Sequence, residues 1–153
     1  LRLESLEKWE PFVGEDRAVY RVSRQKRDTA FAQIVLDNYG HACAVTRLKF
    51  RTSAHSEAHG AHIISKEVRG TDDPRNGLAL SRSVHWAFDR GIFTISDKYE
   101  IVINPKARGA SVANFPLMEM DRRKIALPRD DYYRPHPEAL EWHKLEVFDR
   151  FVP

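Results

Sequence analysis

The chain has 153 residues and a mass of 17.7 kDa, which is enough for one domain with a hydrophobic core of its own. Hydrophobic residues make up 42% of the sequence and charged residues 31%, and the net charge of +3 permits nucleic-acid binding without arguing for it. The single cysteine, Cys43, excludes an internal disulfide framework, an iron–sulfur site and a zinc ribbon built on paired cysteines. One cysteine also fits a reducing compartment, so we expect a cytoplasmic protein. No apolar run is long enough to span a membrane.

The start of the sequence favours a processed form or a fragment. It begins with Leu1 rather than Met, and no signal-peptide pattern follows. We expect residues 1–24 to be a lead-in or a linker from a missing domain, with a short helix at Leu3–Trp9. Residues 25–153 are then expected to form a single domain.

The first long element predicted is a helix over residues 28–39. Apolar residues recur there at helical spacing, at Phe31, Ile34 and Val35. Gly40 follows the helix as a stop signal. The short apolar run at residues 43–45 then predicts a buried strand or turn, and the polar residues 51–60 predict a loop.

The middle of the chain predicts two short strands and a helix. Residues 61–64 form one apolar run and residues 78–80 a second, with turn-forming residues between them at 69–76. A helix is predicted over about residues 84–90. The residues expected to bound it are Ser81 or Ser83 as the cap and Gly91 as the stop.

The last third of the chain predicts a hairpin, a surface segment and a final helix. Residues 92–95 and 99–103 flank a short turn, which is a hairpin signal. Residues 105–135 are rich in Pro and Arg and are expected to wrap the surface. Pro137 opens an amphipathic helix. Its predicted apolar side consists of Leu140, Leu145, Val147, Phe148 and Phe151.

Four residues in this middle region have side chains suited to hydrolytic chemistry. His62 lies in an apolar run, Asn76 follows 14 residues later, and His85 follows nine residues after Asn76. Asp89 is four residues beyond His85, so both side chains lie on one helical face. A histidine and a carboxylate so placed can share one metal ion, and without a thiolate they favour a hard ion. A strand-borne histidine facing that ion could act as a general base, since imidazole is largely neutral at pH 7.

The same region resembles the HNH endonucleases, whose site is a ββα-metal motif. The matching runs are A-H-I at residues 61–63, N-G-L-A-L at residues 76–80 and H-W-A-F-D-R-G-I-F at residues 85–93. They are similar to the branch without zinc ribbons, found in restriction and phage-defence nucleases, and the likeness covers roughly residues 24–151. It implies an α+β fold with a ββα-metal core, flanking helices and a β-hairpin.

The resemblance also implies a role for each of the four residues. His62 would be the general base, Asn76 would brace the loop and orient the backbone at His62, and His85 and Asp89 would be metal ligands. The catalytic set is then His62, Asn76 and His85, and cleavage would leave 5′-phosphate and 3′-hydroxyl ends. Many HNH enzymes have a further ligand directly before the base, where this chain has Ala61. Two protein ligands completed by water and phosphate favour Mg²⁺, with Mn²⁺ or Ni²⁺ able to substitute.

Five basic residues around the proposed site are expected to hold the DNA backbone in a sequence-neutral, salt-sensitive way. They are Lys66, Arg69, Arg75, Arg82 and Arg90. The alternative interpretation is that these charges form ordinary solvated faces. No segment has the pattern of a base-recognition helix, so sequence specificity is expected to lie in another domain or to be absent.

The function expected from the sequence is that of a metal-dependent DNA endonuclease, the effector of a restriction or anti-phage defence system. Two alternatives remain: a non-catalytic nucleic-acid-binding module that kept the HNH fold, and a nuclease of the same chemistry acting on RNA or single-stranded DNA. Cleavage of both strands by a one-site nuclease often needs two copies, so a homodimer is a further expectation.

Two other histidines, His59 and His143, lie close to the predicted site or to the predicted core. His59 precedes His62 by three residues, and on a strand that offset places the two side chains on opposite faces. Whether His59 contacts the metal therefore stays open. His143 lies beside the apolar side of the last helix, where a packing or hydrogen-bonding role is expected.

Overall fold

The computed structural model describes residues 8–14, 20–109 and 116–153, of which residues 20–25, 109 and 116 are described by their backbone alone. The helix predicted over Leu3–Trp9 falls mostly outside these residues. Within them, no helix is long and apolar enough to cross a membrane.

The first helix, α1 (Tyr20–Asn38), begins eight residues before the predicted one and ends one residue before its predicted end. Its buried side comprises Phe31, 2% exposed, and Val35, 3% exposed. Ile34, expected on the same side, is 36% exposed. Gly40 follows the helix with a φ of 61°, as expected of a glycine that ends a helix.

The central element is an antiparallel hairpin of β1 (His59–His62) and β2 (Gly77–Leu80), paired so that His59 faces Leu80 and His62 faces Gly77. The first strand was predicted over residues 61–64 and in fact begins two residues earlier. It ends at His62, two residues before the predicted end, and the Ile63 amide still bonds to the backbone oxygen of Asn76, which lies before β2.

Helix α2 (Arg82–Asp89) follows the hairpin directly. Ser81, one of the two predicted cap residues, is the N-cap residue of α2, but its side chain makes no capping hydrogen bond. Glu57, in the loop before β1, does this instead: its Oε1 accepts from the Arg82 amide at 3.0 Å. The cap therefore comes from a distant segment, which no local pattern could indicate.

The predicted second hairpin is confirmed as β3 (Phe93–Ile95) and β4 (Ile101–Ile103). The segment after it includes α3 (Pro105–Gly109) and two 3₁₀ turns, at Pro116–Met120 and Asp131–Tyr133.

The final helix, α4 (Pro137–His143), begins at the predicted proline and continues as a π-helical turn over Lys144–Phe148. Leu140 and Phe151 are buried as expected, but Leu145 is 50% exposed. The prediction for Leu145 is wrong because the π-helical turn changes the residue period that an α-helix would have kept.

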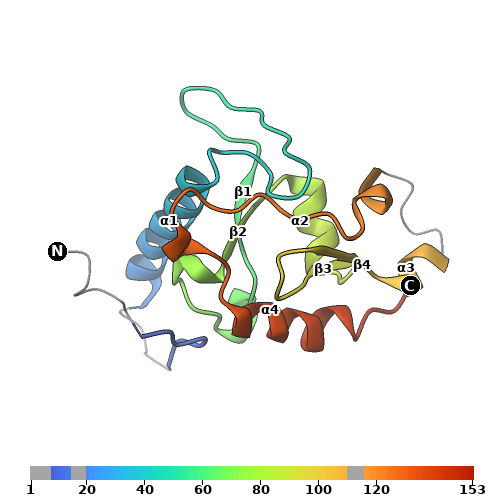
Figure 1. The fold of residues 1–153 in the computed structure, drawn as a ribbon. Helices are drawn as coiled ribbons and strands as arrows, with labels where there is room; N and C mark the ends of the chain where they lie inside the picture. The colour runs from blue at the N-terminus through green and yellow to red at the C-terminus, as the bar shows by residue number, and fades with distance from the viewer. Residues whose placement is uncertain (1–7, 15–19, 110–115) are drawn as a thin grey trace.

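These elements pack around the first hairpin (Figure 1), with α1 on one side of β1 and β2 and α2 on the other, against β1 and β3. Helix α4 packs along β3, and the loop before β1 projects beyond the rest of the chain. The expected α+β fold with a ββα core of β1, β2 and α2, a second hairpin and flanking helices is confirmed.

Candidate active site

The strand β1 places a histidine against helix α2. The Nδ1 atoms of His59 and His85 lie 3.2 Å apart, and the two rings meet edge to face at 88°. On its other side, Nε2 of His85 lies 3.2 Å from Oδ2 of Asp89, four residues later on the same helical face. His59, His85 and Asp89 therefore form a continuous row in which His85 is central.

His62 lies on the opposite face of β1, as the offset of three predicts. Its ring stacks on Phe31 of α1, with centroids 3.8 Å apart and planes within 13° of parallel. Its Nε2 lies 2.9 Å from Oδ1 of Asp72. Among the described residues, no hydrogen bond or ring contact joins His62 to His85 or Asp89. Of the predicted site residues, the structure thus brings His85 and Asp89 together and holds His62 apart.

Asp72 is a residue that the sequence did not single out. Lys66 donates to both of its carboxylate oxygens, at 2.8 and 2.9 Å, and lies 3.3 Å from Asp28 as well. Burial alone would raise the pKa of Asp72, but the hydrogen bonds from His62 and Lys66 hold it below its ordinary value. The carboxylate is therefore charged at neutral pH and accepts the Nε2 proton of His62. The only sequence signal was its place in a turn-rich segment.

Asn76 is fully buried and fastens the chain just beyond His62. Its Oδ1 accepts from the Ile64 amide at 2.8 Å, while its Nδ2 donates to the carbonyls of Ile64 at 3.1 Å and Thr71 at 2.9 Å. Its backbone oxygen accepts from the Ile63 amide at 2.8 Å. These bonds tie the end of β1 to the start of β2.

The electrostatics around His59 favour its neutral form. Burial is the main cause that lowers its pKa, and the nearby charges of His85 and Arg82 lower it further. Glu57 acts in the opposite direction with a smaller effect. A neutral imidazole is the form that binds metal ions.

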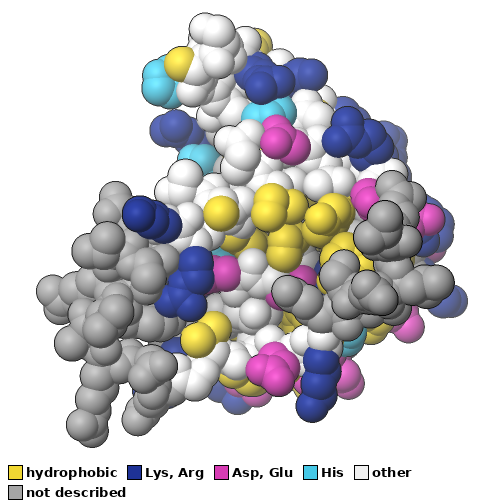
Figure 2. Space-filling view, turned by 90° about the vertical axis from the view of Figure 1, so that its left-hand side faces the viewer, with side chains coloured by type: hydrophobic (Ala, Val, Ile, Leu, Met, Phe, Trp, Pro, Cys, Tyr) yellow, Lys and Arg dark blue, Asp and Glu magenta, His cyan; other side chains and the backbone are white. Residues whose placement is uncertain are grey.

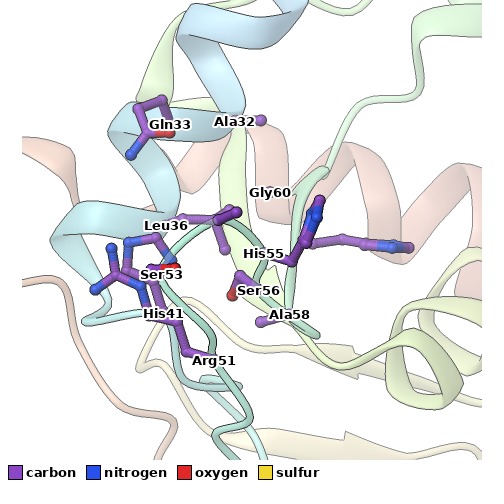
Figure 3. A pocket seen from close by; sticks show the side chains of 12 residues that line it. Ala32, Gln33, Leu36, His41, Arg51, Ser53, His55, Ser56, Ala58 and Gly60 are labelled. Carbon is purple, nitrogen blue, oxygen red and sulfur yellow. The ribbon is translucent and has the colours of Figure 1, made fainter.

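A pocket of about 540 Å³ opens beside His59, between α1 and the loop that leads into β1. Figure 3 shows side chains of both segments along its walls. Two buried polar atoms in this wall, Nδ1 of His41 and Oγ of Ser56, have no hydrogen-bond partner among the described residues. His59 and Gly60 of β1 are among the residues that line the pocket.

Two of the five basic residues predicted to contact DNA are already paired with carboxylates. Lys66 binds Asp72, as described, and Nη2 of Arg75 lies 2.6 Å from Oδ2 of Asp73. Arg75 also lies over the ring of Trp9, 5.5 Å from its centroid. These pairs lower the net positive charge that the two side chains can offer to a phosphate.

The other three basic residues, Arg69, Arg82 and Arg90, are exposed. The guanidinium of Arg90 lies 4.1 Å from the centroid of the Trp86 ring on the same helix. On the face drawn in Figure 2, Lys and Arg side chains lie at several places around a central hydrophobic group rather than in one continuous patch.

His143 has the structural role that the sequence predicts. It stacks on Phe88 with centroids 3.7 Å apart, its Nε2 donates to the Phe88 carbonyl at 2.9 Å, and the Thr94 hydroxyl donates to its Nδ1 at 2.8 Å. Burial, the largest cause, lowers its pKa to about 4. This histidine therefore stays neutral and joins α4 to α2 and β3.

The donor set around His85 fits a divalent cation, because imidazole and carboxylate groups are ordinary ligands for such ions. Among the residues that the structure describes, no group of three or more His, Cys, Asp or Glu side chains converges as a metal site. Any ion here would thus take much of its coordination from water or substrate.

Comparisons with known proteins agree with this geometry. Residues 43–96 match the family model described as HNH endonuclease, a span that contains β1, β2, α2 and β3. Among solved structures, a "modification dependent TagI restriction endonuclease" is similar in fold, with a TM-score of 0.55 and 18% sequence identity. The match covers 77% of this chain and 37% of that one, so the chain spans little more than a third of the neighbour's length. No curated protein matches the chain.

The family match rests on the segment in which the structure builds its histidine-bearing hairpin and helix. The pairing of β1 with β2, followed at once by α2, is the ββα order that the resemblance implies. Residues 43–96 of this chain are therefore similar to the HNH endonucleases both in sequence and in the order of their elements.

Proposed function

We propose that this protein is a nuclease that hydrolyses DNA phosphodiester bonds with the help of a divalent metal ion, leaving 5′-phosphate and 3′-hydroxyl ends. The observation that carries the proposal is that β1 bears one histidine on each face and that the two histidines contact different groups. His62 is held by a charged carboxylate, while His59 meets the helix that bears His85 and Asp89. One face is suited to moving a proton and the other to holding a cation.

His62 is proposed as the general base. Because the charged Asp72 accepts the proton on Nε2, the lone pair of the neutral ring lies on Nδ1, which can take a proton from water. In an in-line displacement, the attacking water and the leaving oxygen lie on opposite sides of phosphorus. A base that does not touch the metal ligands is therefore compatible with this reaction.

The ion is proposed to bind beside His85 and Asp89, the pair that the sequence predicts as its ligands. When bound, a divalent cation would stabilise the negative charge that grows on the phosphate oxygen and on the leaving 3′-oxygen. Asn76 is proposed to keep the end of β1, and hence His62, in place through its bonds to Ile63 and Ile64. The basic residues predicted around the site, with Arg69, Arg82 and Arg90 the exposed ones, are proposed to contact the DNA backbone.

The biological setting proposed is restriction of foreign or modified DNA. The structural neighbour is called a modification-dependent restriction endonuclease, and this chain matches little more than a third of it. Recognition of the DNA would then fall to another module or partner. Cleavage of both strands would use two copies of the chain.

A plasmid-nicking assay with Mg²⁺, Mn²⁺ or Ni²⁺ tests the proposal. We expect His62→Ala to lower the cleavage rate by about 10²–10⁴-fold while metal and DNA binding stay near the wild-type values. His55→Ala is the matched control, because His55 is exposed in the loop before β1 and should cleave at the wild-type rate.

Three outcomes would contradict parts of the proposal. If no ion supports cleavage at protein concentrations that bind the DNA, the chain is a non-catalytic binding module. If RNA or single-stranded DNA is cut faster than the plasmid in a parallel digestion, the substrate assignment is wrong. If His62→Ala cleaves at the wild-type rate, another group is the base.

A further inference from the structure

We infer that the ion is held between the Nδ1 atoms of His59 and His85, and that Asp89 orients His85 instead of binding the ion. This inference rests on the proposed metal dependence and changes its ligand set. It assigns His59, which the sequence left open, to the metal site.

The first argument is the distance between the two ring nitrogens. Two imidazole nitrogens that bind one ion at about 2.0–2.1 Å, at angles between octahedral and tetrahedral, lie about 2.9–3.4 Å apart. The Nδ1 atoms of His59 and His85 lie 3.2 Å apart, with the rings at 88° to one another. The two nitrogens are thus already at the separation that a shared ion requires.

The second argument comes from the pleat of β1. Residues two apart on a strand share a face, so His59 lies on the same face as Ala61. Ala61 stands where the resemblance leads one to expect a metal ligand, but alanine has no donor atom and is only 2% exposed. His59, with its longer side chain, brings a donor to that face from two residues earlier.

The third argument concerns the two nitrogens of His85. Asp89 lies 3.2 Å from Nε2, whereas His59 lies beside Nδ1. A terminal histidine ligand binds one ion through one nitrogen, so His59 and Asp89 cannot both join the same ion in this arrangement. If Nδ1 of His85 binds the ion, its Nε2–H donates a hydrogen bond to the Asp89 carboxylate. A carboxylate outside the coordination sphere commonly orients a metal-bound histidine in this way.

The ligand set has a consequence for the choice of metal. Two imidazoles favour borderline ions such as Ni²⁺ or Zn²⁺, whereas Mg²⁺ favours oxygen ligands. With two protein ligands, the remaining positions would be filled by water and by a phosphate oxygen. A His59 and His85 pair is therefore expected to bind a borderline ion more tightly than Mg²⁺, whereas a His85 and Asp89 pair would favour Mg²⁺.

Calorimetric titration of the whole chain with Mn²⁺, Ni²⁺ or Zn²⁺, without DNA, tests the inference. We expect His59→Ala and His85→Ala each to weaken binding by at least about 10-fold, and Asp89→Asn, which keeps an oxygen acceptor, to weaken it less than either. His55→Ala should bind as the wild type does. Thermal melts of each variant in EDTA separate loss of the site from loss of the fold.

Nitrogen NMR with Zn²⁺ gives a readout independent of affinity and activity. We expect the ring signals of His59 and His85 to show binding through Nδ1, with the Nε2 proton of His85 retained. Unchanged affinity in a folded His59→Ala, or Zn²⁺ on Nε2 of His85, would overturn the inference, as would a wild-type chain that binds no ion. If His59→Ala binds the ion as the wild type does and the chain still cleaves DNA, the inference fails and the proposed function stands. If ion binding depends on His59 but the wild-type chain does not cleave DNA, only the proposed function fails.

Discussion

Oδ1 of Asp72 lies 2.9 Å from Nε2 of His62, and Lys66 donates to the same carboxylate at 2.8 Å. The contact joins the histidine proposed as general base to a loop residue ten positions later. It sets which ring nitrogen of His62 carries the proton, and Lys66 keeps the carboxylate charged. The orientation of the proposed base thus depends on a residue outside the runs that resemble the HNH family.

Replacing Asp72 with Asn tests this relationship. The amide has no charge and can present either a donor or an acceptor to Nε2, so the tautomer of His62 is no longer fixed. We expect cleavage to fall by between about 10-fold and 10⁴-fold, with metal affinity unchanged. Asp97→Asn, on the exposed turn of the second hairpin, is the control. A wild-type cleavage rate in folded Asp72→Asn would contradict the orienting role.

Asp72 should also contribute to the pH dependence of stability. Its folded-state pKa lies below the ordinary value because of the bonds from His62 and Lys66, although burial opposes them. The stabilisation is therefore complete above the unfolded pKa of about 3.9 and is lost as pH falls through the folded value. Urea unfolding at neutral and acid pH should show the difference between wild type and Asp72→Asn shrinking on acidification.

His143 should produce a second pH effect, in a higher pH range. Its folded-state pKa of about 4, lowered chiefly by burial, lies below the ordinary histidine value of 6.5. The folded state then keeps the ring neutral while the unfolded chain takes up a proton below 6.5. Stability should be complete above that pH and fall by up to about 3 kcal/mol as the pH drops to about 4.

The variant His143→Phe isolates this effect. It removes the titrating group, along with two hydrogen bonds, so we expect a lower stability at pH 7 and a flatter pH dependence between pH 6.5 and 4. The free energy of unfolding measured in urea across that range gives the slope. A slope as steep as in the wild type would show that other groups cause the acid sensitivity.

The sequence predicted the parts of the fold that depend on local pattern. The buried pair Phe31 and Val35, the second hairpin and the start of α4 at Pro137 followed from periodicity and stop signals, and the structure confirms them. The first eight residues of α1, from Tyr20, were missed because they have no apolar stripe at helical spacing.

The parts of the site that were not predicted depend on contacts between distant segments. His59 and His85 are 26 residues apart, and their contact follows from how α2 packs against β1. Asp72 lies in a loop without periodicity, where its partner could not be read from spacing. In contrast, the contact of His85 with Asp89 is set by the helix repeat alone and was predicted.

Asn76→Ala tests the brace between the two strands. The variant leaves the amide of Ile64 and the carbonyls of Ile64 and Thr71 without their side-chain partner inside the protein. We expect the free energy of unfolding to fall by about 2–4 kcal/mol, since each unsatisfied buried group costs about 1–3 kcal/mol and some will find water. Asn38→Ala, which removes one exposed bond to Ile34, should cost far less. Equal losses in the two variants would contradict the bracing role.

Gly60→Ala tests whether the placement of β1 against α1 sets the geometry of the site. A Cβ at this position would lie 2.7 Å from the Cα and 3.1 Å from the carbonyl oxygen of Ala32, both backbone atoms that cannot rotate away. The strand must shift, carrying with it His59 and His62, which lie on its two faces. We expect a loss of about 1–3 kcal/mol in stability, with weaker metal binding and slower cleavage in the fraction that stays folded. Gly14→Ala, where nothing lies within 4 Å of the added Cβ, is the matched control. If Gly60→Ala lost stability but kept wild-type metal affinity and cleavage, the two histidines would not depend on the position of β1 against α1.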